Sequence, residues 1–267
     1  PPRSTLFPYT TLFRSIRAGA TSFYYPVSMD EVLEIIRSTP GRYAVTGVPC
    51  FHKALRRLRY QDDLINQRIE FQLGIVCGQM KSAHYLEYLT KLAAGEGRLQ
   101  SACFRRKVPG SPADDYAFEA TVESLDRTVN TAQVLNSRIG VNWGMGYFKP
   151  QACDYCDDVM AETADVSVMD AWLPKYVGDG LGWSLVAART RGIEKLLLAG
   201  HQSGELALEP LDAAAVANSQ RGAFNHRQKA LPYRLWLKDG KWTPTKRFCA
   251  DPKLSFLLRL EQRLREY

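Results

Sequence analysis

Apolar positions in the first third of the chain follow two periods, and their order predicts an α/β unit. Apolar residues three or four positions apart predict helices, whereas short continuous apolar runs predict buried strands. The first helix places Val32, Ile35 and Ile36 on one side. Ser28 is its predicted N-cap, and Gly41 follows its end. The predicted elements are a helix at 28–38, a strand at 43–46, a helix at 52–60, a strand at 69–76 and a helix at 82–92. A strand–helix–strand order implies a parallel pair whose carboxyl ends share one edge.

The middle of the chain changes to an alternating pattern, which predicts a β-hairpin. Residues 99–108 and 116–122 alternate in polarity and flank a turn rich in proline and glycine at 109–112. Later runs predict strands at 165–168 and 184–188 and helices from Ile193 to Gly200 and at 252–267. We therefore predict an α/β (mixed α+β) fold, with an open mixed sheet, flanking helices, a β-hairpin insertion and cysteine-bearing loops.

Composition is that of an ordinary globular protein, and the charge is concentrated at one end. Hydrophobic residues make up 45% of the chain and charged residues 24%. No apolar run is long enough to predict a transmembrane segment. Of the net charge of +7, residues 221–267 alone supply twelve basic against four acidic side chains. No alternation of basic and aromatic residues favours a nucleic-acid partner. Six cysteines are too few for a secreted disulfide scaffold of this length, so we expect a cytoplasmic protein.

Four of the cysteines occupy positions that such a fold would bring together. Cys50 and Cys77 each follow a predicted strand, and Cys153 and Cys156 form a CxxC turn. Four soft thiolates that meet at one edge of a sheet suit either a [4Fe–4S] cluster or a zinc ion. The spacing alone does not choose between these two centres.

The other polar candidates have structural interpretations. We expect Cys103 and Cys249 to be structural or free thiols. The carboxylates that follow the CxxC turn, Asp157 and Asp158, are expected to be solvated. No Ser/His/Asp or Cys/His arrangement identifies a nucleophile, so no catalytic residue is predicted.

Several short motifs occur together in this chain. They are TGVPC at 46–50, GIVCG at 74–78, CDYCDD at 153–158, ADVSVMDAWLP at 164–174, GWSLV at 182–186 and Arg189-Thr190. Together they resemble the coenzyme F420 hydrogenase/dehydrogenase beta-subunit family, over residues 20–235 and mostly its C-terminal domain. A Gly-Asp-x-Trp pattern is usual in that family where this chain has Met169-Asp170-Ala171-Trp172.

The resemblance implies an iron–sulfur flavoprotein oxidoreductase. Members of the family carry FAD and [4Fe–4S] clusters, and known relatives reduce coenzyme F420 or use ferredoxin to reduce chlorophyll-type substrates. The cluster ligands implied by position are Cys50, Cys77, Cys153 and Cys156. The expected partner is an electron donor or acceptor such as ferredoxin, or a hydrogenase or dehydrogenase subunit.

FAD requires backbone N–H groups and cations for its pyrophosphate and a dry surface for its ring. The residues predicted to meet these needs are Thr46, Gly47, Arg105, Lys107, Asn142 and Trp143. Two other functions stay open: a zinc- or cluster-stabilised, non-catalytic accessory protein of a polysaccharide biosynthesis pathway, and an electron-transfer subunit that depends on a catalytic partner.

The resemblance also suggests a division of the chain. Residues 1–15 back-translate, codon by codon, into a common sequencing adapter, and we interpret them as an artefact. Residues 16–26 are interpreted as the remnant of a truncated N-terminal domain and 27–205 as the family's C-terminal-type domain. Residues 206–267 are interpreted as a basic helical C-terminal segment.

Overall fold

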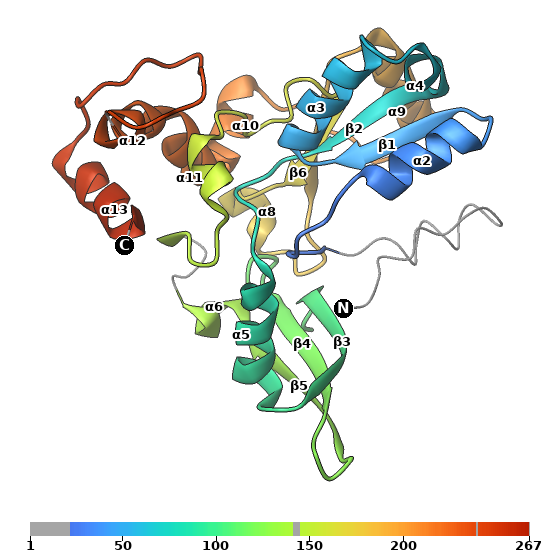
Figure 1. Ribbon diagram of the computed structural model, residues 1–267. Coiled ribbons are helices and arrows are strands. Elements are labelled where there is room, and N and C mark those ends of the chain that lie inside the picture. Colours follow the sequence, from blue (N-terminus) through green and yellow to red (C-terminus); the bar gives the residue numbers. More distant parts are fainter. Residues whose placement is uncertain (1–21, 141–144, 239, 267) are drawn as a thin grey trace.

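A four-stranded mixed sheet organises the larger part of the protein. The computed structural model describes residues 22–140, 145–238 and 240–266 (Figure 1). The strands are β1 (Tyr43–Gly47), β2 (Ile69–Ile75), β6 (Val166–Asp170) and β7 (Ser184–Ala188), in the spatial order β1-β2-β6-β7. The first three are parallel, and β7 pairs antiparallel to β6. The predicted mixed α/β sheet is therefore confirmed.

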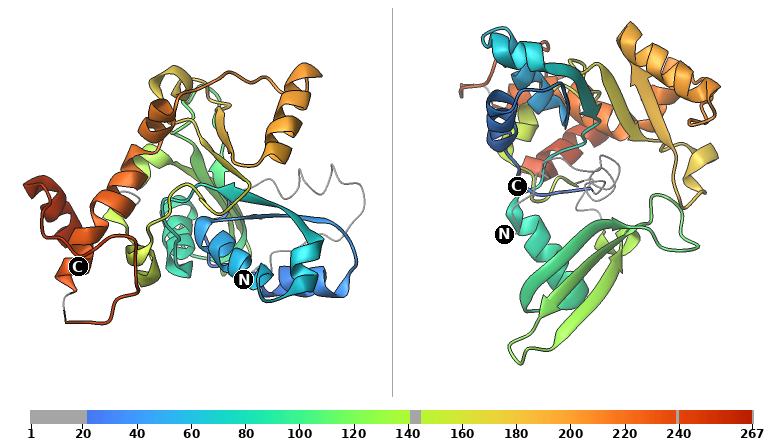
Figure 2. Two further views of the ribbon diagram at one scale, coloured as in Figure 1. Left: turned by 90° about the horizontal axis from the view of Figure 1, so that it is seen from above. Right: turned by 90° about the vertical axis from the view of Figure 1, so that its right-hand side faces the viewer.

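Helices cover both faces of this sheet. They are α2 (Asp30–Ser38), α3 (Pro49–Arg59), α4 (Asp63–Arg68) and α9 (Arg191–Gln202). Figures 1 and 2 show α2 and α3 on one face and α9 on the other. Ile36 of α2, Leu55 of α3 and Ile65 of α4 pack with Val45 and Ile69 in one buried cluster. Burial of these five side chains is what fixes the helices to the sheet.

The predicted N-cap of the first helix is wrong by one residue. The N-cap position is occupied by Met29, without a side-chain cap, and the C-cap is Thr39. The hydroxyl of Ser28 instead donates to the carboxylate of Asp30. Because that acidic side chain lies in the first turn, it competes with the backbone N–H groups for the serine hydroxyl.

A second, antiparallel sheet projects from the first, as Figures 1 and 2 both show. It consists of β3 (Arg98–Arg106), β4 (Ala117–Glu123) and β5 (Val129–Leu135), and α5 (Ala83–Ala94) covers it. Tyr85 and Leu89 of the helix pack on Phe104, Phe118 and other apolar residues of the sheet. The predicted hairpin is confirmed as β3 and β4, but β5 was not predicted.

Short helical elements connect the sheets and form the end of the chain. They are α6 (Asn136–Ile139), the 3-10 helix η1 (Gln151–Tyr155), α8 (Pro174–Val177), α10 (Ala213–Ser219), α11 (Arg221–Phe224), the π-helix η2 (Asn225–Lys229), α12 (Leu231–Leu237) and α13 (Phe256–Glu266). The helices α11, α12 and α13 lie on the side of the molecule opposite α4 (Figure 1). In the part of the chain that the structure describes, no helix combines the length and apolar character needed to cross a bilayer.

Candidate metal centre

The four cysteines predicted as ligands come from three loops at the carboxyl edge of the parallel strands. Cys50 lies in the first turn of α3, directly after β1, and Cys77 follows the end of β2. Cys153 lies in η1, and Cys156 is its C-cap. The Cys77 backbone N–H donates to the carbonyl of Val159 at 3.3 Å, which ties the second loop to the third. Loops that follow parallel strands emerge on the same side of a sheet, and open α/β sheets carry their sites there.

The four thiols influence one another electrostatically. The pKa of Cys77 is raised to about 12, mainly by burial; Arg227 lowers it, and Cys153, Cys50 and Cys156 add to the increase. The pKa of Cys50 is also raised, first by desolvation of its sulfur and then by Cys156 and Cys153. A positive centre beside Cys50 and Cys77 would favour their thiolate forms.

The part of the chain that the structure describes shows no compact group of side chains around a single metal position. Within the described residues, no three His, Cys, Asp or Glu side chains are grouped closely enough to hold one ion. Thiolates on one zinc ion all lie about 2.3 Å from it. The ligands of a [4Fe–4S] cluster bind different iron atoms and therefore stand farther apart. By residue type, the four cysteines are compatible with either centre.

A buried arginine lies at the centre of this group. Arg227, from η2, is only 2% exposed. Its Nε and Nη2 atoms donate to the carbonyl of Gly78 at 2.8 and 2.6 Å, and Nη2 lies 3.8 Å from the sulfur of Cys77. Among the described residues, no carboxylate pairs with this guanidinium. Burial lowers the pKa of Arg227, but the four cysteines outweigh burial and the net shift is upward. A buried cation without a carboxylate requires another negative charge, and the thiolates of an occupied centre supply it.

Two further arginines of the C-terminal segment hold the loop that carries the CxxC turn. Arg234, 2% exposed, donates from Nε and Nη2 to the carbonyl of Asp154 at 3.1 and 3.0 Å. Arg247 lies 3.1 Å from Asp157, to which Lys53 of α3 also bonds at 2.9 Å. These contacts connect the third cysteine loop to α3 and to the end of the chain.

The prediction that the carboxylates after the CxxC turn are solvated is wrong. Asp157 is 5% exposed and Asp158 is fully buried. Asp158 accepts the backbone N–H of Glu162 at 3.2 and 3.1 Å, so it caps the turn that follows. Both carboxylates have partners in the fold that sequence spacing does not reveal, and these partners account for their burial.

Individual hydrogen bonds reach two of the sulfurs. The Met80 backbone N–H donates to the sulfur of Cys153 at 3.4 Å, and the thiol of Cys156 lies 3.6 Å from the carbonyl of Asp158. Cys103 and Cys249 also have free thiols.

The residues predicted to bind FAD fall into two groups at the same sheet edge. Thr46 and Gly47 end β1 beside Cys50, and Thr46 is exposed. The guanidinium of Arg105 forms a two-pronged ion pair with Asp170 at the end of β6, at 2.8 and 3.0 Å. It also stacks over Trp172, 5.6 Å from the ring centre. Arg105 thus fastens the antiparallel sheet to the mixed sheet, which is a structural role that the sequence pattern did not indicate.

The remaining predicted FAD residues are less tightly held or are not described. Lys107 is exposed just after β3. Its ammonium nitrogen lies 3.2 Å from the position that a Cβ atom would occupy if Gly182 carried a side chain. Asn142 and Trp143 lie outside the described residues. The structure therefore brings Thr46 and Gly47 to the cysteines and places Arg105 and Lys107 at the junction of the two sheets.

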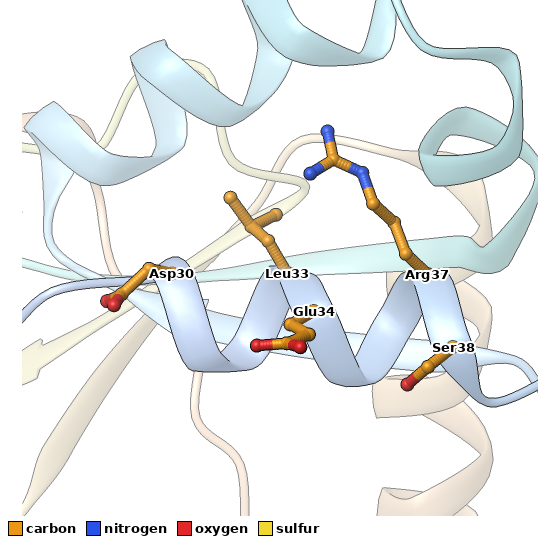
Figure 3. Close-up of a pocket in the computed structure, with 5 residues that line it drawn as sticks. All are labelled: Asp30, Leu33, Glu34, Arg37 and Ser38. Carbon is orange, nitrogen blue, oxygen red and sulfur yellow. The ribbon is translucent and has the colours of Figure 1, made fainter.

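A surface pocket on α2 is separate from these groups. It is lined by Asp30, Leu33, Glu34, Arg37 and Ser38, as Figure 3 shows. Its arginine is paired with Asp62 at 2.9 Å. All five lining residues belong to one helix, and none of them is a cysteine or a predicted flavin contact. We assign no chemistry to this pocket.

Comparison with known proteins identifies a family and a similar fold. Residues 41–214 match the family described as the C terminus of the coenzyme F420 hydrogenase/dehydrogenase beta subunit. Among solved structures, a chain of the xenon-derivatised F420-reducing [NiFe] hydrogenase complex from Methanosarcina barkeri is similar, with a TM-score of 0.58 and 18% identity. The alignment covers 86% of this chain and 75% of the hydrogenase chain, and it supports the fold. No curated protein sequence matches the chain.

Proposed function

This chain belongs to the coenzyme F420 hydrogenase/dehydrogenase beta-subunit family, and from that premise we propose that it is an iron–sulfur flavoprotein oxidoreductase. The observation that carries the proposal is the group of four thiols around Arg227. A buried guanidinium without a carboxylate beside four cysteines from three loops is the environment of an anionic, thiolate-ligated centre.

We assign Cys50, Cys77, Cys153 and Cys156 as the ligands of one [4Fe–4S] cluster. When bound, such a cluster passes single electrons, and FAD exchanges a hydride with a two-electron substrate. Arg227, Arg234 and the bond from Cys77 to Val159 hold the loops of Cys77 and of the CxxC turn. Lys53 joins α3, which carries Cys50, to Asp157 after that turn. The N–H of Met80 stabilises negative charge on the sulfur of Cys153.

We propose that the redox partner is coenzyme F420, ferredoxin, or a hydrogenase or dehydrogenase subunit. We also propose that the protein acts in the cytoplasm. A family founded on hydrogenase and dehydrogenase beta subunits supports this class of partner. The basic C-terminal segment, with twelve basic against four acidic residues over 221–267, favours an acidic protein or a phosphate-bearing cofactor at that side.

The composition of the purified protein tests the proposal directly. We expect anaerobically purified protein to contain iron, acid-labile sulfide and FAD, and to show broad visible absorbance that dithionite bleaches. The measurements are the visible spectrum and analyses of iron, sulfide, zinc and flavin. A colourless preparation with one zinc ion per chain and no flavin would refute the proposal and favour a zinc-stabilised accessory protein.

Lys107 provides a separate test of the flavin site. We propose that Thr46, Gly47, Arg105 and Lys107, together with Asn142 and Trp143, contact FAD. Because a charge-assisted hydrogen bond contributes about 1.5–3 kcal/mol, Lys107→Ala is expected to weaken FAD binding by about tenfold or more. Arg105 is less suitable for this test, since its loss would also break the ion pair to Asp170.

The affinity is measured by fluorescence titration of flavin-depleted protein with FAD. Lys195→Ala removes an exposed lysine from α9, on the other side of the mixed sheet, and serves as the matched control. An FAD affinity of the Lys107 variant equal to that of the control would remove Lys107 from the site.

A further inference from the structure

We propose that Arg227 is a built-in counter-charge that raises the reduction potential of the cluster while it positions the Cys77 loop. This inference rests on the proposed cluster. Arg227 belongs to the C-terminal segment, whereas the four cysteines of the centre lie at least seventy positions earlier in the chain. The inference thus gives a distant residue a function in that centre.

The first step of the argument is the geometry of the side chain. Arg227 directs two N–H groups at one carbonyl, that of Gly78, and one of these nitrogens also faces the Cys77 sulfur at 3.8 Å. Its backbone belongs to a π-helix, in which the N–H of Ala230 reaches back to the carbonyl of Asn225 at 2.9 Å. Single π-turns inside helices are frequent at functional sites because they redirect a side chain.

The second step is the missing counter-ion. Two other arginines near the carboxyl edge are paired with acids, Arg105 with Asp170 and Arg247 with Asp157. Arg227 is more deeply buried than either, yet in the described parts of the chain its neighbours are a carbonyl and thiols. If its only function were to brace the Gly78 carbonyl, a neutral donor would serve without the desolvation cost of a charge.

The third step is the charge of the centre. Four thiolates give a bound cluster net negative charge, and reduction adds one more electron to it. A fixed positive charge in a region of low dielectric favours the more negative state. Arg227 therefore favours the reduced cluster, and removing its charge must lower the reduction potential.

The test compares the wild-type protein with Arg227→Met and Arg227→Lys. The Met variant removes the charge and keeps much of the volume, whereas the Lys variant keeps the charge and loses the two-pronged bond to Gly78. Arg68→Met is the matched control, because Arg68 also donates to two carbonyls, of Ile36 and Arg37 at 2.7 and 2.9 Å. Arg68 lies at the opposite end of β2 from Cys77.

The readout is the midpoint potential from a dithionite titration followed by electron paramagnetic resonance, with iron content measured in parallel. For Arg227→Met we expect at least a tenfold shift of the redox equilibrium toward the oxidised cluster, which is about 59 mV downward for one electron. For Arg227→Lys and Arg68→Met we expect the redox equilibrium of the cluster to shift by well under tenfold.

The outcomes separate this inference from the proposed function. A wild-type protein without iron and sulfide refutes the cluster itself. An Arg227→Met protein that keeps its cluster at the wild-type potential overturns the counter-charge and leaves the cluster standing. If the Met variant assembles no cluster, the Lys variant decides: a cluster near the wild-type potential supports the role of charge, and an equally empty protein overturns it.

Discussion

Replacement of Cys153 by serine is expected to leave the protein without its cluster. Cys153 is 8% exposed, so its sulfur lies inside the site. A serine hydroxyl is a hard donor that stays protonated near neutral pH, so it is a much poorer ligand for cluster iron than a thiolate. Even loss of an outer-sphere partner lowers metal affinity by about 10–100-fold, so loss of a ligand is expected to reduce bound iron by more than about tenfold.

The measurement is iron per chain, together with the visible spectrum, in Cys153→Ser and in a control thiol variant. Cys103→Ser is the control, because Cys103 lies in β3 opposite Glu119 and not at the sheet edge that carries the other thiols. We expect the control to keep its iron. Wild-type iron content in the Cys153 variant would remove this residue from the ligand set.

The substitution Gly74→Ala is expected to destabilise the mixed sheet strongly. Gly74 lies in β2, between β1 and β6, and pairs with Gly47 and Ser167. A Cβ at this position would stand 2.5 Å from the Cβ of Ala161 and 2.9 Å from that of Ala164. Real Cβ atoms do not approach so closely, so either β2 or the segment that contains Ala161 and Ala164 must move.

The segment that must move is the one that follows the CxxC turn. Ala161 is fully buried and already has a positive φ of 50°, so little local adjustment is available to it. Overpacking of this kind typically costs about 1–3 kcal/mol, and here we expect the upper end, about 3 kcal/mol. Displacement of this segment would also move Cys156, so cluster content is expected to fall together with the melting temperature.

Gly178→Ala is the matched control for this substitution. Gly178 has a φ of −64°, and no atom lies within 4 Å of the position its Cβ would take. We expect the thermal unfolding midpoint of the Gly178→Ala variant, measured with and without cofactors, to stay close to that of the wild-type protein. A Gly74 variant as stable as the Gly178 variant would contradict the close contact between β2 and the segment 159–164.

The cysteine positions were predictable from the sequence because a simple geometric rule governs them. Cys50 and Cys77 follow apolar strands with a helix between them, and such strands are parallel and end on one edge. The fold class could be predicted for the same reason. By contrast, β5 was missed because only Val134 among its residues is buried, so the strand lacks an apolar pattern.

The basic residues of the site could not be predicted, because their role depends on contacts across the whole chain. Arg227 lies 150 positions after Cys77, in a segment whose many basic residues are typical of a solvated face. No local signal in the sequence distinguishes it from the other basic residues of that segment. Arg105, predicted to contact FAD, also pairs with Asp170, and no local pattern in the sequence reveals this role of joining two sheets.

The position of these arginines also has a consequence for the order in which the protein matures. During translation, all four cysteines leave the ribosome before Arg227, Arg234 and Arg247 have been synthesised. Until those residues arrive, the cysteine loops lack both their counter-charge and the contacts to the carbonyls of Gly78 and Asp154. Cofactor insertion is therefore expected to follow synthesis of these arginines, and nascent chains stalled before residue 227 should incorporate little iron.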